Sequence, residues 1–151
     1  MTVHRTRRLA LAAAVALSAV GTALATLPAA QGAPAAASKP KLVNCSGIGT
    51  VKPKGFIITC ADAGDSLTKL KWSNWSTTAS GKGTDVVNDC KPNCAEGHFH
   101  KYGVDVSLFR VKPWSHHAGQ RYYTRMGLTY TGKVPHGFHR HRTVNLWATK
   151  I

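Results

Sequence analysis

Two stretches in the second half of the chain alternate apolar and polar residues, which is the pattern of a half-buried β-strand. In Tyr102–Val111, every second residue from the first to Leu108 is apolar. In Tyr122–Tyr130, the even-numbered residues are expected on one face of a second strand. The opposite face is then expected to carry Tyr123, Arg125 and Thr129.

Four further runs are short, rich in β-branched or aromatic residues, and bounded by turn-forming residues, so they also predict strands. They are Phe56–Cys60, Leu67–Trp75, Thr84–Asp89 and Thr143–Thr149. The second of these runs is expected to place Leu70 and Trp72 on one face. Strict alternation then places Lys69, Lys71 and Trp75 on the other face.

The segments between these runs contain glycine, proline, aspartate and other small residues, which favours turns and loops. The expected loops are Ala61–Ser66, Thr77–Gly83, Lys112–Gln120 and Thr131–Arg142. No segment beyond the N-terminal region shows a convincing helical period. The sequence therefore predicts an all-β fold: a small disulfide-bonded β-sandwich or barrel of about six or seven strands.

The N-terminal region has the order of features that defines a secretory signal peptide. Three arginines in Met1–Arg8 are followed by the uncharged, apolar run Leu9–Ala25. Cleavage is expected after Ala25, with Gly32 or Ala37 as alternatives, and no membrane span is expected to remain. Residues 26–40 are rich in alanine and proline and are expected to form a disordered spacer. The chain is therefore expected to be extracellular, with one folded domain over residues 41–151.

All four cysteines lie beyond the signal region, and an even number of cysteines in a small exported domain predicts disulfides. Three pairings are possible, and the simplest joins sequence neighbours: Cys45 with Cys60, and Cys90 with Cys94. The first bridge would close a loop worth roughly 3 kcal/mol in chain entropy, and the second roughly 2 kcal/mol. Between Cys90 and Cys94, a Lys-Pro-Asn segment suits a tight turn.

A metal site is the alternative use of the segment Asn88–His100. The spacing of Cys90 and Cys94 fits the first half of many zinc sites, but His98 follows too closely to complete a zinc finger. On a strand, His98 and His100 would share a face, so they are weak candidates for a surface Zn or Cu site. No cofactor is predicted.

The chain is strongly basic, with 20 Lys and Arg residues, six acidic residues and a formal net charge of +14. Loss of the three arginines before Leu9 leaves 17 basic and six acidic side chains, a net charge of +11. Such a field favours anionic partners: a wall polymer, an acidic polysaccharide or nucleic acid. The candidate polyanion-binding residues are Lys69 and Lys71, with Arg140, Arg142 and Phe138 near the C-terminus. The alternative is that solvated lysines only keep the protein soluble. The oligomeric state stays open.

The sequence contains none of the common catalytic motifs: no nucleophile elbow, no phosphate-binding glycine loop and no His-Glu-x-x-His helix. We therefore expect a protein that is not an enzyme. The least implausible enzyme is a small secreted ribonuclease that uses Glu96, His98 or His100 with an arginine, because phosphodiester cleavage needs an acid and a base.

Four motifs together resemble a family of small exported proteins of high-GC Gram-positive bacteria. They are Cys60-Ala-Asp-Ala-Gly64, Leu70-Lys-Trp-Ser-Asn-Trp75, Ala79-x-Gly-x-Gly-Thr84 and Asn88-Asp-Cys-x-Pro-Asn-Cys-Ala-x-Gly97. The resemblance covers roughly Cys45–Pro135. It implies export and a compact domain, but no activity is assigned to that family and no catalytic residue is carried over.

Overall fold

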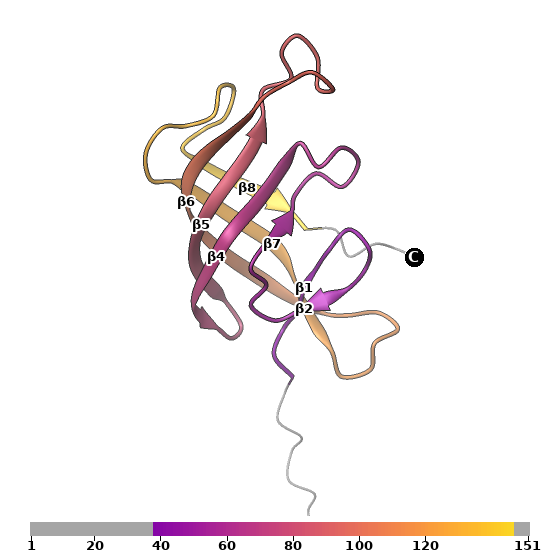
Figure 1. Ribbon diagram of the computed structural model, residues 1–151. Helices are drawn as coiled ribbons and strands as arrows, with labels where there is room; N and C mark the ends of the chain where they lie inside the picture. The colour runs from indigo at the N-terminus through magenta and orange to yellow at the C-terminus, as the bar shows by residue number, and fades with distance from the viewer. Residues whose placement is uncertain (1–37, 147–151) are drawn as a thin grey trace, which may run out of the picture. The chain divides into compact units, whose positions relative to one another are not determined.

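The computed structural model describes residues 38–146, and all eight of the elements in this part of the chain are strands. Six strands follow one another in a single antiparallel sheet, and two short strands pair separately (Figure 1). The short pair is β1 (Leu42–Val43) and β2 (Gly49–Thr50). The six-stranded sheet contains, in order, β3 (Phe56–Ile57), β4 (Asp65–Trp75), β5 (Ala79–Asn88), β6 (Phe99–Pro113), β7 (Arg121–Tyr130) and β8 (His141–Asn145).

The sheet is curled into a half-barrel whose two edges are β3 and β8 (Figure 1). The inner face carries a continuous apolar core that includes residues of β4, β6 and β7. This arrangement confirms the predicted all-β, disulfide-bonded fold. Among residues 38–146, no helix is long and apolar enough to cross a membrane.

Strand β6 shows the predicted alternation, with Val104, Val106 and Leu108 buried. Strand β7 does not keep the predicted phase over its whole length, because Tyr123 is buried in place of Tyr122. The change occurs opposite Arg110, whose backbone is left-handed with φ 56°. The hydroxyl of Thr124 donates to the carbonyl of this arginine at 2.8 Å, and the inward-facing set of β7 shifts by one residue at this point.

The predicted faces of β4 were wrong for Trp75. Two irregularities in the pairing of β4 with β5 change which side chains face inward. The first lies between Thr68 and Lys71 and includes Lys69, which has φ 52°; the second lies between Trp72 and Asn74. An extra residue at a bulge reverses the alternation that follows it. Trp75 is therefore buried in the core, on the face of Leu70 and Trp72 and away from the lysines.

The expected loop Thr77–Gly83 is mostly strand, since β5 begins at Ala79. The glycines that suggested a loop instead make room for the bulged neighbouring strand. A Cβ atom at Gly81 would lie 3.0 Å from the Trp72 ring, and one at Gly83 would lie 2.8 Å from Leu70 Cδ2. Glycine is needed at these positions for packing, not for a turn.

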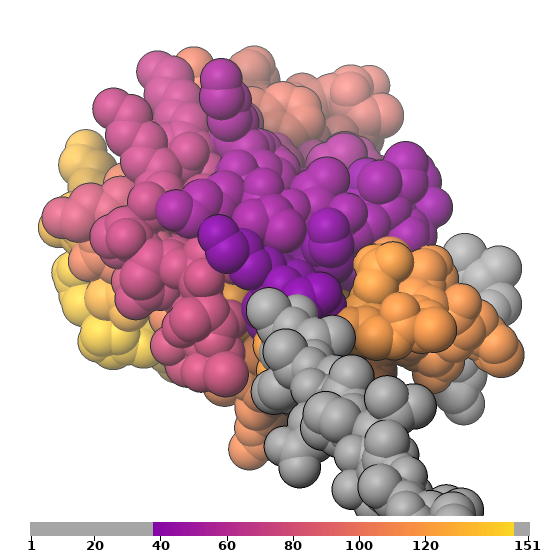
Figure 2. Space-filling view, turned by 90° about the horizontal axis from the view of Figure 1, so that it is seen from below, coloured from indigo at the N-terminus to yellow at the C-terminus, as the bar shows by residue number. Residues whose placement is uncertain are grey.

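The folded domain includes residues that the sequence analysis assigned to the spacer. Pro40 is almost fully buried, and its carbonyl accepts a 2.8 Å hydrogen bond from the indole N–H of Trp75. The hydroxyl of Ser38 donates to the carbonyl of Gly119, and Arg121 donates to the carbonyl of Ser38. Figure 2 shows this N-terminal segment, in indigo, against the orange loop that joins β6 and β7.

Both predicted disulfides are present: Cys45–Cys60 and Cys90–Cys94. The first joins the turn between β1 and β2 to the chain just beyond β3, and the second closes a loop between β5 and β6. Two disulfides and no free cysteine are consistent with an oxidising location. The expected signal peptide, its expected cleavage sites and residues 147–149 of the last expected strand lie outside the described residues.

Candidate functional site

The outer face of the sheet, opposite the core, carries a row of polar side chains that crosses five strands. Lys71 pairs with Lys82, Lys82 with Asp105, Asp105 with Thr129, and Thr129 with His141. We call these five residues the charged row. Directly opposed residues of neighbouring antiparallel strands point to the same face, so these side chains form one continuous line.

A second row of small residues runs beside the charged row on the same face, and we call it the hydroxyl row. Its members are Ser73, Ser80, Ser107, Gly127 and Thr143. The two serine hydroxyls of β4 and β5 lie 2.9 Å apart. Because these side chains are short, the surface is lower along the hydroxyl row than along the neighbouring charged row. The resulting shallow groove has a volume of about 580 Å³ and includes Lys71, Lys82 and Ser107 in its lining.

Two contacts link neighbouring members of the charged row. Lys82 Nζ lies 3.9 Å from Asp105 Oδ1, and the lysine side chain is 84% exposed. This is a loose pair in water, so the ammonium group is free to meet a ligand. At the other end of the row, Thr129 Oγ1 and His141 Nδ1 are 3.0 Å apart. Lys71 is exposed.

Positive charge extends from the groove along the outer face. A neighbouring hollow is lined by Lys69, Lys101 and the two threonines Thr68 and Thr84. The only carboxylate of the charged row is Asp105, and two of the six acidic residues, Asp65 and Asp85, are buried in the core instead. Burial of these acids leaves the outer face with a local excess of basic groups.

The two buried acids form a cluster on the inner face with Tyr130 and Arg142. The hydroxyl of Tyr130 donates to Asp85 Oδ2 at 2.6 Å. Arg142 Nη2 lies 2.5 Å from Asp65 Oδ2 and 3.6 Å from Asp85 Oδ2. The guanidinium carbon also lies 4.3 Å from the centre of the Phe138 ring. Arg142 therefore ties the edge strand β8 to β4 and β5 across the interior of the half-barrel.

This cluster contains two carboxyl groups and one arginine, so its charges do not balance when both acids are ionised. Burial, followed by the hydrogen bond with Asp65, raises the pKa of Asp85 to about 7. Burial and the neighbouring Asp85 also raise the pKa of Tyr130. The Oδ1 atoms of both acids are buried without another partner. A proton on Asp85 would remove the excess negative charge of the cluster.

The structure separates the five predicted polyanion-binding residues into two groups. Lys69 and Lys71 are exposed on the outer face. By contrast, Arg140 donates to the carbonyls of Tyr130 and Gly132, and Arg142 and Phe138 belong to the buried cluster. Because Arg142 and Phe138 are half-buried against each other, we leave them out of the candidate surface, whereas Arg140 is exposed and its role in polyanion binding stays a prediction.

The predicted histidine pair lies beside the Cys90–Cys94 loop. His98 and His100 are both exposed, and His100 Nε2 lies 3.0 Å from Asp89 Oδ2. Hydrogen bonds from His100 and from the backbone of His98 lower the pKa of Asp89. No group of three or more metal-ligating side chains gathers anywhere in residues 38–146. Metal binding by these histidines and an RNA-cleaving role with Glu96 stay predictions.

Sequence reasoning missed Lys82, Asp105 and His141, which lie in three different strands. Their alignment depends on the register of the sheet, and the segment that contains Lys82 was expected to be a loop. No family model, curated protein or solved structure matches the chain.

Proposed function

We propose that this protein is an exported, non-enzymatic binding domain that holds an anionic extracellular polymer on the outer face of its sheet. The observation that carries the proposal is the alignment of Lys71 and Lys82 beside the hydroxyl row in one groove. The two disulfides and the signal-like N-terminal sequence support action outside the cytoplasm.

The groove suits a linear anion for two physical reasons. Lysine ammonium groups attract phosphate, sulfate or carboxylate groups at long range, and the net charge of +11 that remains without the three arginines before Leu9 strengthens this attraction. The short side chains of Ser80 and Ser107 allow a polymer backbone to approach the sheet, and their hydroxyls can donate hydrogen bonds to its oxygens.

The test is a salt titration of binding to two soluble probes, dextran sulfate and single-stranded DNA. The logarithm of the binding constant should fall linearly with the logarithm of the salt concentration, because binding releases counterions from the polymer. In the double variant Lys71→Gln/Lys82→Gln, the slope should decrease by about two, about one for each contact removed.

The matched control is Lys54→Gln/Lys133→Gln, which removes the same charge from two exposed lysines in loops. This control should keep most of the wild-type slope. Equal losses in the two double variants would show that only net charge matters and would refute a defined groove. Affinity that does not change with salt would refute binding through charge altogether.

A further inference from the structure

The six-stranded sheet has two edges, and they differ in length and in what lies beside them. Strand β3 contains two residues, and the chain just beyond it is cross-linked through Cys60 to the turn between β1 and β2. Strand β8 contains five residues and pairs with β7 on one side. On its other side it has no neighbouring strand within residues 38–146. An open edge of this kind can pair with a strand from another chain.

The hydrogen-bond pattern shows which residues of β8 face the open side. The backbone N–H of Tyr130 donates to the carbonyl of Arg140, and the N–H of Leu146 donates to the carbonyl of Thr124. In an antiparallel pair every second residue bonds to the neighbouring strand, so the even-numbered residues of β8 bond to β7. The N–H and C=O groups of the three odd-numbered residues therefore point outward; these residues are His141, Thr143 and Asn145.

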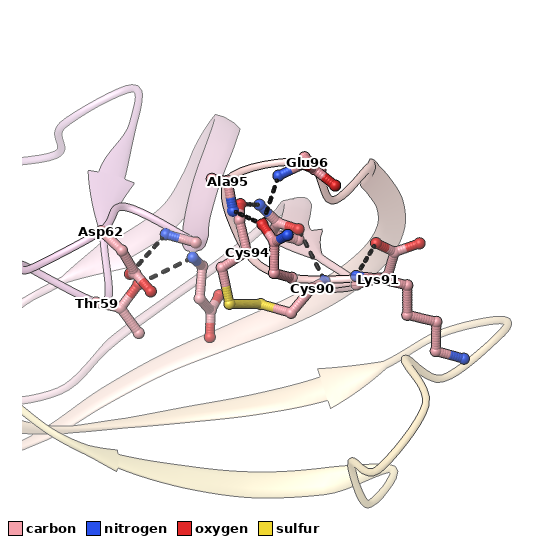
Figure 3. The surroundings of a disulfide bond; sticks show 12 residues. Thr59, Asp62, Cys90, Lys91, Cys94, Ala95 and Glu96 are labelled. Atoms are coloured by element: carbon pink, nitrogen blue, oxygen red, sulfur yellow. Dashed lines mark hydrogen bonds between the residues drawn. A yellow bond between two sulfur atoms is a disulfide. The ribbon is translucent and has the colours of Figure 1, made fainter.

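The outward backbone groups of β8 have no hydrogen-bond partner in the described part of the chain. In the loop between β5 and β6, by contrast, side chains accept from the backbone N–H groups of Cys90, Lys91 and Ala95 (Figure 3). Sheet edges are commonly protected by lysine, proline, a bulge or an inward-pointing charge. Strand β8 contains neither lysine nor proline, and its pairing with β7 is regular. Its inward charge, Arg142, is already held by the buried acids.

From these observations we propose that two copies of this protein pair through their β8 edges, antiparallel about a two-fold axis at Thr143. Thr143 then faces Thr143 of the second copy, and His141 faces Asn145, so no like charges are directly opposed. The outward N–H and C=O groups of each opposed pair can exchange two hydrogen bonds. Val144 and Leu146 line an apolar pocket of about 180 Å³ at the same edge, so the edge also offers apolar surface to the second copy.

Pairing at this edge would extend the proposed binding face. The hydroxyl row ends at Thr143, so the hydroxyl rows of the two copies meet end to end on one outer face. A polymer held as proposed above could then follow one groove across both copies. The dimer itself does not depend on polymer binding, so a dimer that fails to bind dextran sulfate would refute only the proposed function.

Sedimentation equilibrium of the oxidised protein, from micromolar to millimolar concentration, measures the dissociation constant of the dimer. Because the two copies carry the same positive net charge, added salt should strengthen the dimer, whereas it should weaken polymer binding. In Thr143→Pro, both central hydrogen bonds are lost, so the dissociation constant should rise about tenfold or more. The missing N–H faces away from β7, so the monomer should stay folded.

The matched control is Thr143→Val, which keeps the backbone N–H and a β-branched side chain and should dimerise as the wild type does. A protein that is monomeric at every concentration, or a dimer that Thr143→Pro does not weaken, would overturn the proposal.

Amide hydrogen exchange, followed by NMR, tests the same edge without any substitution. The three outward amides of β8 should exchange more slowly at concentrations where the dimer forms than in the monomer. The amides of Arg142 and Val144 bond to β7 and should be protected at both concentrations. Slow exchange of the outward amides in the monomer would show that another segment of the same chain, such as residues 147–151, covers the edge. That result, or equally fast exchange at both concentrations, would overturn pairing through β8.

Discussion

Replacement of Asp85 by asparagine tests whether the buried acid pair holds a proton. Asp85 is fully buried, and its Oδ2 already accepts from Tyr130. In Asp85→Asn, the new amide can accept from the same hydroxyl and donate to Asp65, as a protonated Asp85 would. The variant therefore copies the protonated state of the side chain without any need to bind a proton.

The magnitude follows from the pKa of Asp85, which rises from 3.8 to about 7 on folding. An acid whose pKa rises on folding stabilises the folded state below its unfolded pKa, near 3.8. That contribution is lost as the pH rises through about 7. A difference of about three pKa units corresponds to at most about 4 kcal/mol between the two ends of this range. Asp85→Asn removes this loss, because asparagine does not ionise.

The assay is urea unfolding of the oxidised protein and of Asp85→Asn at pH 4, 6 and 8. Histidine titration affects both proteins, so the quantity of interest is their difference in unfolding free energy at each pH. This difference should move in favour of the variant as the pH rises, and at pH 8 the variant should be the more stable protein. A difference that does not change with pH, or a less stable variant at pH 8, would refute protonation of the buried Asp85.

Three other substitutions test the contacts that shape the domain. Arg142→Met removes the cation that pairs with the two buried carboxylates, so urea unfolding at pH 8 should show a loss of about 3 kcal/mol, and a smaller loss at pH 4. Gly97→Ala places a methyl group against Asn88 Oδ1 and the backbone of Cys90, so thermal unfolding should report a loss of about 1–3 kcal/mol. Trp75→Phe leaves the buried Pro40 carbonyl without its donor and should cost about 1–3 kcal/mol in urea unfolding; a cost near zero would show that the N-terminal segment adds little stability.

The sequence was sufficient to predict strands whose alternation is unbroken. Val104–Leu108 could be assigned because one face of β6 is buried throughout that stretch. Strand β4 was also predicted, but the faces of its side chains could not be assigned, because its bulges move Trp75 to the core face and a bulge leaves no periodic signal. The glycines of β5 had the opposite effect, since Gly81 and Gly83 resemble loop residues but accommodate the side chains of β4.

The candidate surface was only partly predictable, for a related reason. Lys71 was identified from its neighbours in the sequence, but its alignment with Lys82 and Asp105 depends on how three strands pair. The role of Arg142 was also hidden, because its partner Asp65 lies 77 residues earlier in the chain. Charge counted along a sequence does not distinguish an arginine that binds a ligand from one that neutralises buried acids.

Mapping of backbone amide shifts by NMR during titration with dextran sulfate is the most direct test of the proposed binding face. The account predicts that the largest shifts come from the charged row and the hydroxyl row in β4, β5 and β6, and that added salt reverses them. Shifts confined to the loop between β7 and β8, or spread evenly over all exposed lysines, would contradict a binding site on the outer face of the sheet.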